Sequence, residues 1–372
     1  MKQATRGVPL SGPYLDEREE QLVLEVLRSG RLSLGPTIAA FEEQFAAAVG
    51  APYAAAVSSG TSGLHLLCVA AGIGAGDEVI TSPYSFAASA NCFVYEGAVP
   101  VFADIDPRTL NLDPRAVEAA ITPRTTAIVA VDIYGYPCEL DELRAIASRH
   151  GLAFVQDSCE ALGAEYKGSR IGSHGPSAVF AFYPNKQLTT GEGGIVTTHS
   201  EDEWRLLRSL RNQGRGDDGG WLEHVRLGYN YRLDDVRAAL GIGQLEKLDE
   251  ILSLRRDVAA RYTELLRDVD GVETPCPDDD EHKRSWFVYV VKLPSNEARE
   301  RVIAHFERED IGFNRYLPSI HLQPYMRERF GFREGLCPVS EDVSARTLAL
   351  PFFTALERDA QERVVEALAA AL

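Results

Sequence analysis

Seven short apolar segments between residues 50 and 200 are separated mostly by amphipathic stretches, and this alternation constrains the fold more than any other feature. The apolar residues are continuous rather than alternating with polar ones, which is typical of strands buried on both faces of a parallel sheet. The predicted strands are residues 54–57, 78–80, 100–103, 127–131, 153–156, 179–182 and 195–198. The predicted helices between them are residues 63–71, 85–97, 114–121 and 139–150. The pattern predicts an α/β fold with a mainly parallel seven-stranded sheet, whose last two strands have no helix between them and form an antiparallel step.

The pattern changes after about residue 200. The predicted elements there are a helix at 201–211, a long helix from 234 to about 269, a strand at 286–293, a helix at 296–310 and a C-terminal helix from 356. A Pro- and Asp-rich stretch at 275–280 marks a junction within this region. We therefore expect a large domain at residues 1–245, with an N-terminal arm, and a smaller C-terminal α+β domain at residues 246–372.

The composition excludes several classes of protein. A length of 372 residues with 45% hydrophobic side chains is enough for two domains with buried cores. The 38 basic and 55 acidic residues give a formal net charge of −17, which argues against nucleic-acid binding. Six scattered cysteines and eight histidines show no disulfide framework and no metal-ligand spacing, so no metal is expected. Without a signal-like stretch or a run of about 20 apolar residues, we expect a cytoplasmic protein that does not span a membrane.

Lys186 has the surroundings that point most directly to chemistry. The sequence Phe-Ala-Phe-Tyr-Pro-Asn-Lys runs from an apolar strand into a Pro-Asn turn, and Thr-Thr-Gly-Glu-Gly-Gly leads into the next strand. An amine held between two buried strands can form a Schiff base if it is neutral often enough, which desolvation and neighbouring cations favour. Taken alone, the segment also fits an ordinary solvated loop lysine.

Three further segments follow strands and are expected at the edge of the sheet where open α/β sheets bind ligands. Residues 58–63, Ser-Ser-Gly-Thr-Ser-Gly, open a helix and form either a phosphate site or an ordinary helix cap. Asp157 ends a strand and either caps the next helix or holds a protonated pyridine nitrogen. Phe86 either stacks on a planar ring or packs in the core.

A fourth segment at residues 227–235, Leu-Gly-Tyr-Asn-Tyr-Arg-Leu-Asp-Asp, precedes the long helix. Asn230 and Arg232 have side chains that can reach a phosphate. The alternative is a helix N-terminal cap, a role that suits Asp234 better than Asn230.

From about residue 8 to residue 370 the chain resembles the DegT/DnrJ/EryC1/StrS family of sugar aminotransferases. These enzymes depend on pyridoxal 5'-phosphate (PLP) and have PLP-dependent transferase fold type I, the aspartate aminotransferase-like fold. The segments that carry the resemblance are Pro9-Leu10-Ser11-Gly12-Pro13, Ser29-Gly30, Ser59-Gly60-Thr61 through Leu64-His65-Leu66, the Lys186 segment, residues 228–232, Gln244-Leu245-Glu246-Lys247-Leu248 and Leu317-Pro318-Ser319-Ile320-His321-Leu322-Gln323-Pro324-Tyr325. Several ordered motifs at matching spacing are far more specific than any one of them.

The resemblance implies a cofactor role for each residue at the sheet edge. Lys186 would carry PLP as a Schiff base and shuttle a proton between the cofactor and the substrate carbon, with pyridoxamine phosphate as the intermediate cofactor form. Asp157 would pair with the pyridine nitrogen, and Phe86 would lie over the ring. The implied phosphate ligands are Gly60, Thr61, Ser62 and, contributed across a subunit interface, Asn230. The resemblance therefore implies a homodimer with active sites shared across the interface.

Two positions depart from the pattern of many family members. Many have Ser where this chain has Ala181, so other donors must replace that hydroxyl at the phosphate. Many have Gln at the position of Glu160, whereas members resembling perosamine synthases have Glu there, which implies that Glu160 faces the sugar. From the residues alone, Glu160 also fits an exposed first-turn carboxylate favoured by the helix dipole. Arg232 and His321 lie in matching segments and are expected near the nucleotide sugar or the donor carboxylate.

The implied reaction moves an amino group from L-glutamate to a keto group of a nucleotide-linked sugar, and Glu160 favours a 4-keto-6-deoxy sugar. Such a product would enter polysaccharide, O-antigen or glycosylated natural-product biosynthesis. A sugar dehydratase of the same fold is disfavoured, since that branch has histidine at the position of Lys186. A keto-cyclitol acceptor and a non-catalytic regulatory member of the same fold stay open as alternatives.

Overall fold

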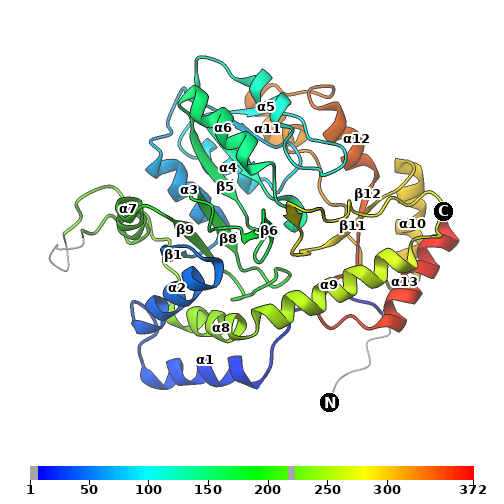
Figure 1. Ribbon diagram of the computed structural model, residues 1–372, viewed down its shortest axis with the longest axis horizontal. Helices are drawn as coiled ribbons and strands as arrows, with labels where there is room; N and C mark the ends of the chain where they lie inside the picture. The colour runs from blue at the N-terminus through cyan, green and yellow to red at the C-terminus, as the bar shows by residue number, and fades with distance from the viewer. Residues whose placement is uncertain (1–6, 217–222) are drawn as a thin grey trace.

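The computed structural model describes residues 7–216 and 223–372, and its centre is a seven-stranded sheet in the order β1-β9-β8-β5-β4-β2-β3 (Figure 1). The strands are β1 (Tyr53–Val57), β2 (Glu78–Thr81), β3 (Val99–Phe102), β4 (Thr125–Val131), β5 (Ala153–Asp157), β8 (Ser177–Ala181) and β9 (Gly194–Thr198). β9 runs antiparallel to both of its neighbours, and the remaining pairs are parallel. The predicted strands and the antiparallel step are thus confirmed, with ends that agree to within two residues.

Helices cover both faces of this sheet because alternate residues of a strand point to opposite sides. In β1, Ala54 and Ala56 belong to one buried cluster, and Ala55 and Val57 belong to another. The first cluster includes residues of α2 (Pro36–Val49), α5 (Pro114–Ala120), α6 (Leu140–His150) and α8 (Asp235–Glu246). The second includes residues of α3 (Gly60–Ala70), α4 (Ala88–Val94) and α7 (Glu201–Arg211). This three-layer arrangement explains why the strand sequences are continuously apolar.

A second buried core lies in the C-terminal part of the chain. Its elements are α9 (Leu248–Leu265), β11 (Tyr289–Lys292), α10 (Asn296–Arg308), β12 (Thr347–Leu350) and α13 (Arg358–Ala371), and β11 pairs antiparallel with β12. The N-terminal arm joins this core: the Val8 N–H donates to the Asp310 carbonyl at 2.9 Å, and the Gly312 N–H donates to the Val8 carbonyl at 2.7 Å. The arm therefore packs on the C-terminal core, and the division at residues 245 and 246 stays a prediction.

The remaining elements connect these cores or cover their edges. They are α1 (Glu17–Ser29), η1 (Ile133–Gly135), β6 (Glu165–Tyr166), β7 (Ser169–Arg170), β10 (His282–Lys283), η2 (Ile320–Leu322), α11 (Pro324–Phe330) and α12 (Pro338–Arg346). α1 lies along α8, and β10 joins β6 and β7 in a small separate sheet. Among the described residues, no helix combines the length and the apolar character needed to cross a membrane.

The helices predicted at residues 63–71 and 85–97 differ by up to three residues from α3 and α4, and two later predictions have wrong boundaries. The long helix predicted from residue 234 to about 269 is two helices, α8 and α9, which meet at Lys247 with φ −118° and ψ 18° (Figure 1). Its ammonium is held by Asp16 at 2.8 Å and by Glu19, contacts from α1 and its N-cap that local sequence does not reveal. The strand predicted from residue 286 begins only at Tyr289, because the carbonyls of Trp286 and Phe287 accept from the Arg255 guanidinium at 2.9 and 2.7 Å.

Candidate active site

The segments singled out in the sequence meet at one edge of the sheet. β1, β2, β5 and β8 all run in the same direction, so their carboxyl ends lie together. Asp157 is the last residue of β5, Lys186 follows β8, Phe86 follows β2, and the Ser59–Ser62 turn follows β1. This is the edge at which open α/β sheets bind ligands.

Lys186 lies against a carboxylate and an aromatic ring. Its Nζ lies 3.4 Å from Glu160 Oε1 and 3.7 Å from the centroid of the Phe287 ring. The side chains of Lys186 and Glu160 are only 13% and 11% exposed. The ordinary solvated lysine considered from sequence is therefore excluded, because this amine is sheltered and faces a partner of opposite charge.

Glu160 is fixed by a backbone donor as well as by the lysine. Its Oε2 accepts from the Tyr134 N–H at 2.9 Å. Burial raises the pKa of the Glu160 carboxyl, and the positive charge of Lys186 opposes that rise. A carboxyl group that can gain a proton near an amine is able to donate or accept a hydrogen bond at this site. The exposed first-turn carboxylate is likewise excluded as a description of Glu160, which is only 9% exposed.

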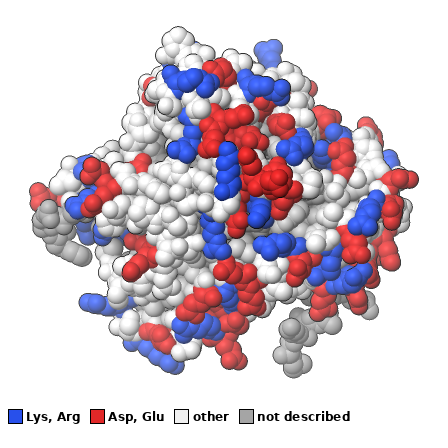
Figure 2. Space-filling view, in the orientation of Figure 1, with Lys and Arg blue, Asp and Glu red and all other residues white. Residues whose placement is uncertain are grey.

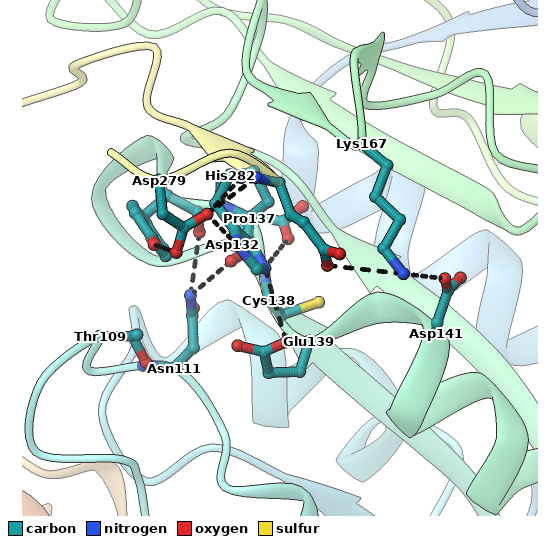
Figure 3. A network of polar contacts seen from close by, with 12 residues as sticks. Thr109, Asn111, Asp132, Pro137, Cys138, Glu139, Asp141, Lys167, Asp279 and His282 are labelled. Atoms are coloured by element: carbon teal, nitrogen blue, oxygen red, sulfur yellow. Dashed lines mark hydrogen bonds and ion pairs between the residues drawn. The ribbon is translucent and has the colours of Figure 1, made fainter. Parts of the chain in front are cut away.

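The loop that presents the Tyr134 N–H is held by a buried polar network (Figure 3). Asn111 Oδ1 accepts from the Ile133 N–H at 2.9 Å, and Asn111 Nδ2 donates to the carbonyls of Tyr136 and Pro137 at 3.0 and 3.1 Å. Asp132 Oδ1 accepts from the Cys138 N–H at 2.9 Å. These bonds fix the loop in which Tyr134 has φ 55°, a conformation that an unsupported tyrosine rarely adopts.

Asp157 lies 6% exposed at the end of β5 and has a partner on each oxygen. Ser89 Oγ lies 2.6 Å from Asp157 Oδ2, and the Cys159 N–H donates to Oδ1 at 3.2 Å. Ser85 Oγ in turn lies 2.6 Å from Ser89 Oγ. The hydroxyl chain sets the orientation of the carboxylate, so its position does not depend on a ligand.

The turn after β1 has the form of an anion site at the start of α3. Ser59 is the N-cap, and its hydroxyl accepts from the Ser62 N–H at 3.1 Å while Ser62 Oγ accepts from the Ser59 N–H at 2.9 Å. A Cβ at Gly60 would lie 2.7 Å from Cys159 Sγ and 2.8 Å from the Ala181 Cβ, so only glycine fits this close packing. Because the first N–H groups of a helix have no acceptor within it, those of Gly60 and Thr61 can bind an anion.

Comparison with known proteins identifies the family. The model of the DegT/DnrJ/EryC1/StrS aminotransferase family matches residues 13–369. The chain belongs to this family. The spore coat polysaccharide biosynthesis protein SpsC of Bacillus subtilis is 39% identical, over 97% of this chain and 96% of that protein. Family members are PLP-dependent aminotransferases, which confirms both the predicted fold class and the predicted resemblance.

Two solved structures illustrate the likeness in three dimensions. DesV of S. venezuelae has a TM-score of 0.92 and 35% identity, covering 98% of both chains. The PLP form of the putative sugar aminotransferase Spr1654 of Streptococcus pneumoniae has a TM-score of 0.93 and 26% identity, also covering 98% of both chains.

The groups at this sheet edge fit the PLP expected for the family. A sheltered amine at Lys186, an oriented carboxylate at Asp157 and a helix N-terminus at Gly60 suit the aldehyde, the pyridine nitrogen and the phosphate of that molecule. Bound PLP supplies stabilisation of a carbanion at the substrate carbon. Ser62 Oγ also donates to the Ser59 carbonyl at 2.8 Å, so its hydroxyl shapes the turn. The contact of Ser62 with a phosphate stays a prediction.

The other predicted site residues are Phe86, Asn230, Arg232 and His321. Phe86 is 66% exposed at the sheet edge, and Asn230 is also exposed. Arg232 donates to Asn212 Oδ1 at 3.1 Å in a cavity of about 290 Å³ beside α2 and α7. His321 is fully buried in η2, where Nε2 lies 2.9 Å from Glu341 Oε1, and its role at the substrate stays a prediction.

Three residues of the site were missed by sequence reasoning. Phe287 and Tyr134 are separated by more than a hundred residues and have no local motif that links either of them to Lys186. Ser89 could have been identified from the sequence. It lies four residues after Ser85, so both serines face the same side of a predicted helix that follows a predicted strand.

Proposed function

We propose that this enzyme transfers an amino group from L-glutamate to the keto group of a nucleotide-linked sugar, with a 4-keto-6-deoxy sugar as the favoured acceptor. The observation that carries the proposal is the sheltered pair formed by Lys186 and Glu160, 3.4 Å apart at the carboxyl edge of the sheet. The similarity to a spore coat polysaccharide biosynthesis protein supports a product used in polysaccharide, O-antigen or glycosylated natural-product synthesis.

Lys186 has the position needed to move a proton at the substrate carbon. The Phe287 ring supports the ammonium, and Glu160 holds it from one side, which limits the directions in which the amine can turn. A positioned amine of this kind acts as a general acid–base catalyst. Asp157 keeps its orientation through Ser89, so a pyridine nitrogen at this point would meet an ordered carboxylate.

Glu160 is proposed to contact the sugar. Its carboxyl lies next to the reacting amine, and its raised pKa lets it carry a proton at a pH where an exposed glutamate would not. Such a group can recognise a sugar hydroxyl or the developing oxygen at the keto carbon. Arg232 and His321 stay proposed substrate residues, and the buried position of His321 favours an indirect role through Glu341.

The active form is proposed to be a homodimer in which Asn230 reaches the phosphate of the other subunit. Two apolar side chains near Asn230 are exposed in the single chain, Leu227 by 84% and Val225 by 52%, and Phe86 at the sheet edge is exposed by 66%. Large apolar side chains gathered near a functional segment are typical of a contact surface.

Two alternative functions predict different experimental results. An enzyme acting on a keto-cyclitol would show the same reaction with glutamate but would not aminate a nucleotide sugar. A non-catalytic regulatory member would bind its ligands without turnover, and the presence of both Lys186 and Asp157 in ordered positions argues against it.

The test follows the visible absorbance of the purified protein with PLP, before and after L-glutamate is added. We expect a yellow protein that loses its colour with glutamate and forms 2-oxoglutarate. A panel of nucleotide-linked 3-keto and 4-keto sugars and keto-cyclitols, read by mass spectrometry, then identifies the acceptor. A yellow protein that does not respond to glutamate would contradict the proposed donor, and the absence of colour would contradict the role of Lys186.

A further inference from the structure

We propose that His65 is a positioning residue that holds the segment carrying Asn230 in the orientation needed to reach a phosphate. The inference rests on the proposed role of Asn230 and adds to it the residue through which that role is maintained. His65 lies on α3, one turn beyond the Gly60 turn, and its ring is 3% exposed. Neither the amine site nor the proposed substrate residues make use of it.

The ring of His65 is enclosed by polar and aromatic partners. Nε2 lies 2.7 Å from Glu96 Oε1, and Nδ1 lies 3.1 Å from the Tyr231 hydroxyl. Because a carboxylate only accepts, Nε2 carries a proton, which leaves Nδ1 to accept from Tyr231 in the neutral ring. The Tyr229 hydroxyl also donates to Glu96 Oε1 at 3.1 Å.

The two tyrosines flank Asn230 and pack on the same ring. The centroids of Tyr229 and Tyr231 lie 4.8 and 5.8 Å from that of His65, and the two phenol rings stack on each other at 5.1 Å. Side chains of an extended segment alternate between its two sides. With Tyr229 and Tyr231 held against His65, Asn230 between them must point away from α3, which agrees with its exposure.

The backbone of this segment is also tied to the phosphate turn. The Ser58 N–H donates to the Tyr231 carbonyl at 2.8 Å, and Asn230 and Arg232 form bridges with Asn212 and Val57. Residues 58–65, which include the cap and first turns of α3, therefore order two features. They form the anion site of their own subunit, and they hold Asn230, which is proposed to reach the other subunit. The Tyr229 and Tyr231 N–H groups also donate to the carbonyls of Leu210 and Arg211 at 2.6 and 2.9 Å, so the contacts of His65 add side-chain support to a segment whose backbone is already bonded.

The experiment compares the affinities of apoprotein variants for PLP and for pyridoxal, which lacks the phosphate. Tyr231→Phe removes only the hydroxyl bonded to His65 and keeps the stacked ring. We expect PLP to bind about five-fold more weakly, the factor that corresponds to the loss of one hydrogen bond, with pyridoxal affinity unchanged. His65→Gln should show the same selective loss. Tyr14→Phe is the matched control, because it removes a tyrosine–carboxylate bond, to Glu250 at 3.0 Å, far from the segment.

A double-mutant cycle decides whether His65 acts through Asn230. If it does, Tyr231→Phe has no further effect on PLP affinity once Asn230→Ala is present. Additive losses, or equal losses for PLP and pyridoxal, would overturn the proposal and leave His65 with a purely structural role. If Asn230→Ala alone left PLP affinity unchanged, the inference would also fall, while colour change with glutamate would show that the proposed aminotransferase reaction still stands.

Discussion

At the scale of single residues, the site depends on a lysine that is charged, sheltered and in contact with only a few groups. Glu160 supplies a counter-charge and Phe287 supplies the electron-rich face of a ring, so the ammonium is stabilised without a strong bidentate ion pair. An amine bound more tightly would be less free to form a covalent bond or to carry a proton. The 3.4 Å separation from Glu160 is consistent with a group that must leave its partner during the reaction.

Replacing Lys186 by alanine should abolish turnover while the protein still binds pyridoxamine phosphate, which needs no covalent bond to the chain. Loss of the general acid–base alone lowers such rates by about 10²–10⁴-fold. The measurement is glutamate-dependent turnover together with titration of pyridoxamine phosphate. Lys283→Ala, which changes a lysine that is 60% exposed, is the control and should keep normal turnover. Turnover near the normal rate in Lys186→Ala would refute the assignment.

Replacing Glu160 by glutamine separates the donor from the acceptor. Because Glu160 contacts Lys186 and is also proposed to face the sugar, the reaction with L-glutamate should slow less than amination of the keto sugar, which should slow by about ten-fold or more. Stopped-flow absorbance measures the first reaction, and product analysis measures the second. A loss confined to the glutamate reaction would contradict the placement of Glu160 at the sugar.

At the scale of elements, the site depends on loops that distant parts of the chain hold in place. The loop with Tyr134 is bonded by Asn111 from one side, and the stretch that leads into β10 approaches it from the other (Figure 3). The His282 ring stacks on Tyr136 at 5.4 Å with an interplanar angle of 11°, and Nδ1 lies 2.9 Å from Asp279 Oδ1. Glu139 lies 3.5 Å from Nε2, a distance typical of an ion pair rather than a hydrogen bond.

The ion pairs of His282 with Glu139 and Asp279 should make the stability of the protein depend on pH. Burial favours the neutral ring, but Glu139 and Asp279 outweigh it and raise the pKa of His282. Burial likewise opposes ionisation of Asp279, yet its bonds with His282 and with backbone N–H groups lower the pKa of Asp279 to about 2. A histidine with a raised pKa contributes stability that is complete below about pH 6.5 and is lost as pH rises through its folded-state value.

The measurement is urea unfolding of the normal protein and of His282→Gln at pH 6 and pH 9. At pH 6 the free energy of unfolding of the normal protein should exceed that of His282→Gln by about 1 kcal/mol or more. At pH 9 this difference between the two proteins should be smaller. If the difference in unfolding free energy between the two proteins is the same at both pH values, the charge of His282 does not contribute to stability.

At the scale of the whole molecule, the amine site combines residues that follow strands of the large sheet with a residue from the C-terminal part of the chain. Lys186, Glu160 and Asp157 come from the large sheet, whereas Phe287 comes from the stretch leading into β11. The surface shown in Figure 2 has acidic and basic side chains interspersed among the residues drawn in colour, without a continuous basic area. A formal net charge of −17 is unfavourable for binding a long polyanion.

Sharing of the active site between subunits can be tested by mixing the inactive variant Lys186→Ala with Asn230→Ala, which should bind PLP weakly. Lys186→Ala retains Asn230, and Asn230→Ala retains Lys186, so a mixed dimer would contain one complete site. Random exchange of subunits should restore tight PLP binding and activity to about a quarter of the sites. Subunit exchange is verified by mass spectrometry. Failure to regain either property in verified mixed dimers would show that Asn230 acts within its own chain.

The sequence by itself determined the strands, the reversal between β8 and β9, and the positions of Lys186 and Asp157 at strand ends. These features follow from local rules: continuous apolar runs form buried strands, and Pro, Asn and Gly mark the turns that follow them. Because the carboxyl ends of parallel strands share one edge, the meeting of these two residues could also be foreseen.

Only the tertiary structure decided the rest of the site. The Phe287 ring reaches Lys186, the Tyr134 N–H reaches Glu160, and the helix breaks at Lys247, through contacts between residues far apart in sequence. The spacing of apolar residues and the residue types in turns depend on a few neighbouring positions. They therefore do not predict contacts between residues that are far apart in the sequence. The packing of the two cores sets these distances, and with them the environment that turns an ordinary lysine into a candidate catalyst.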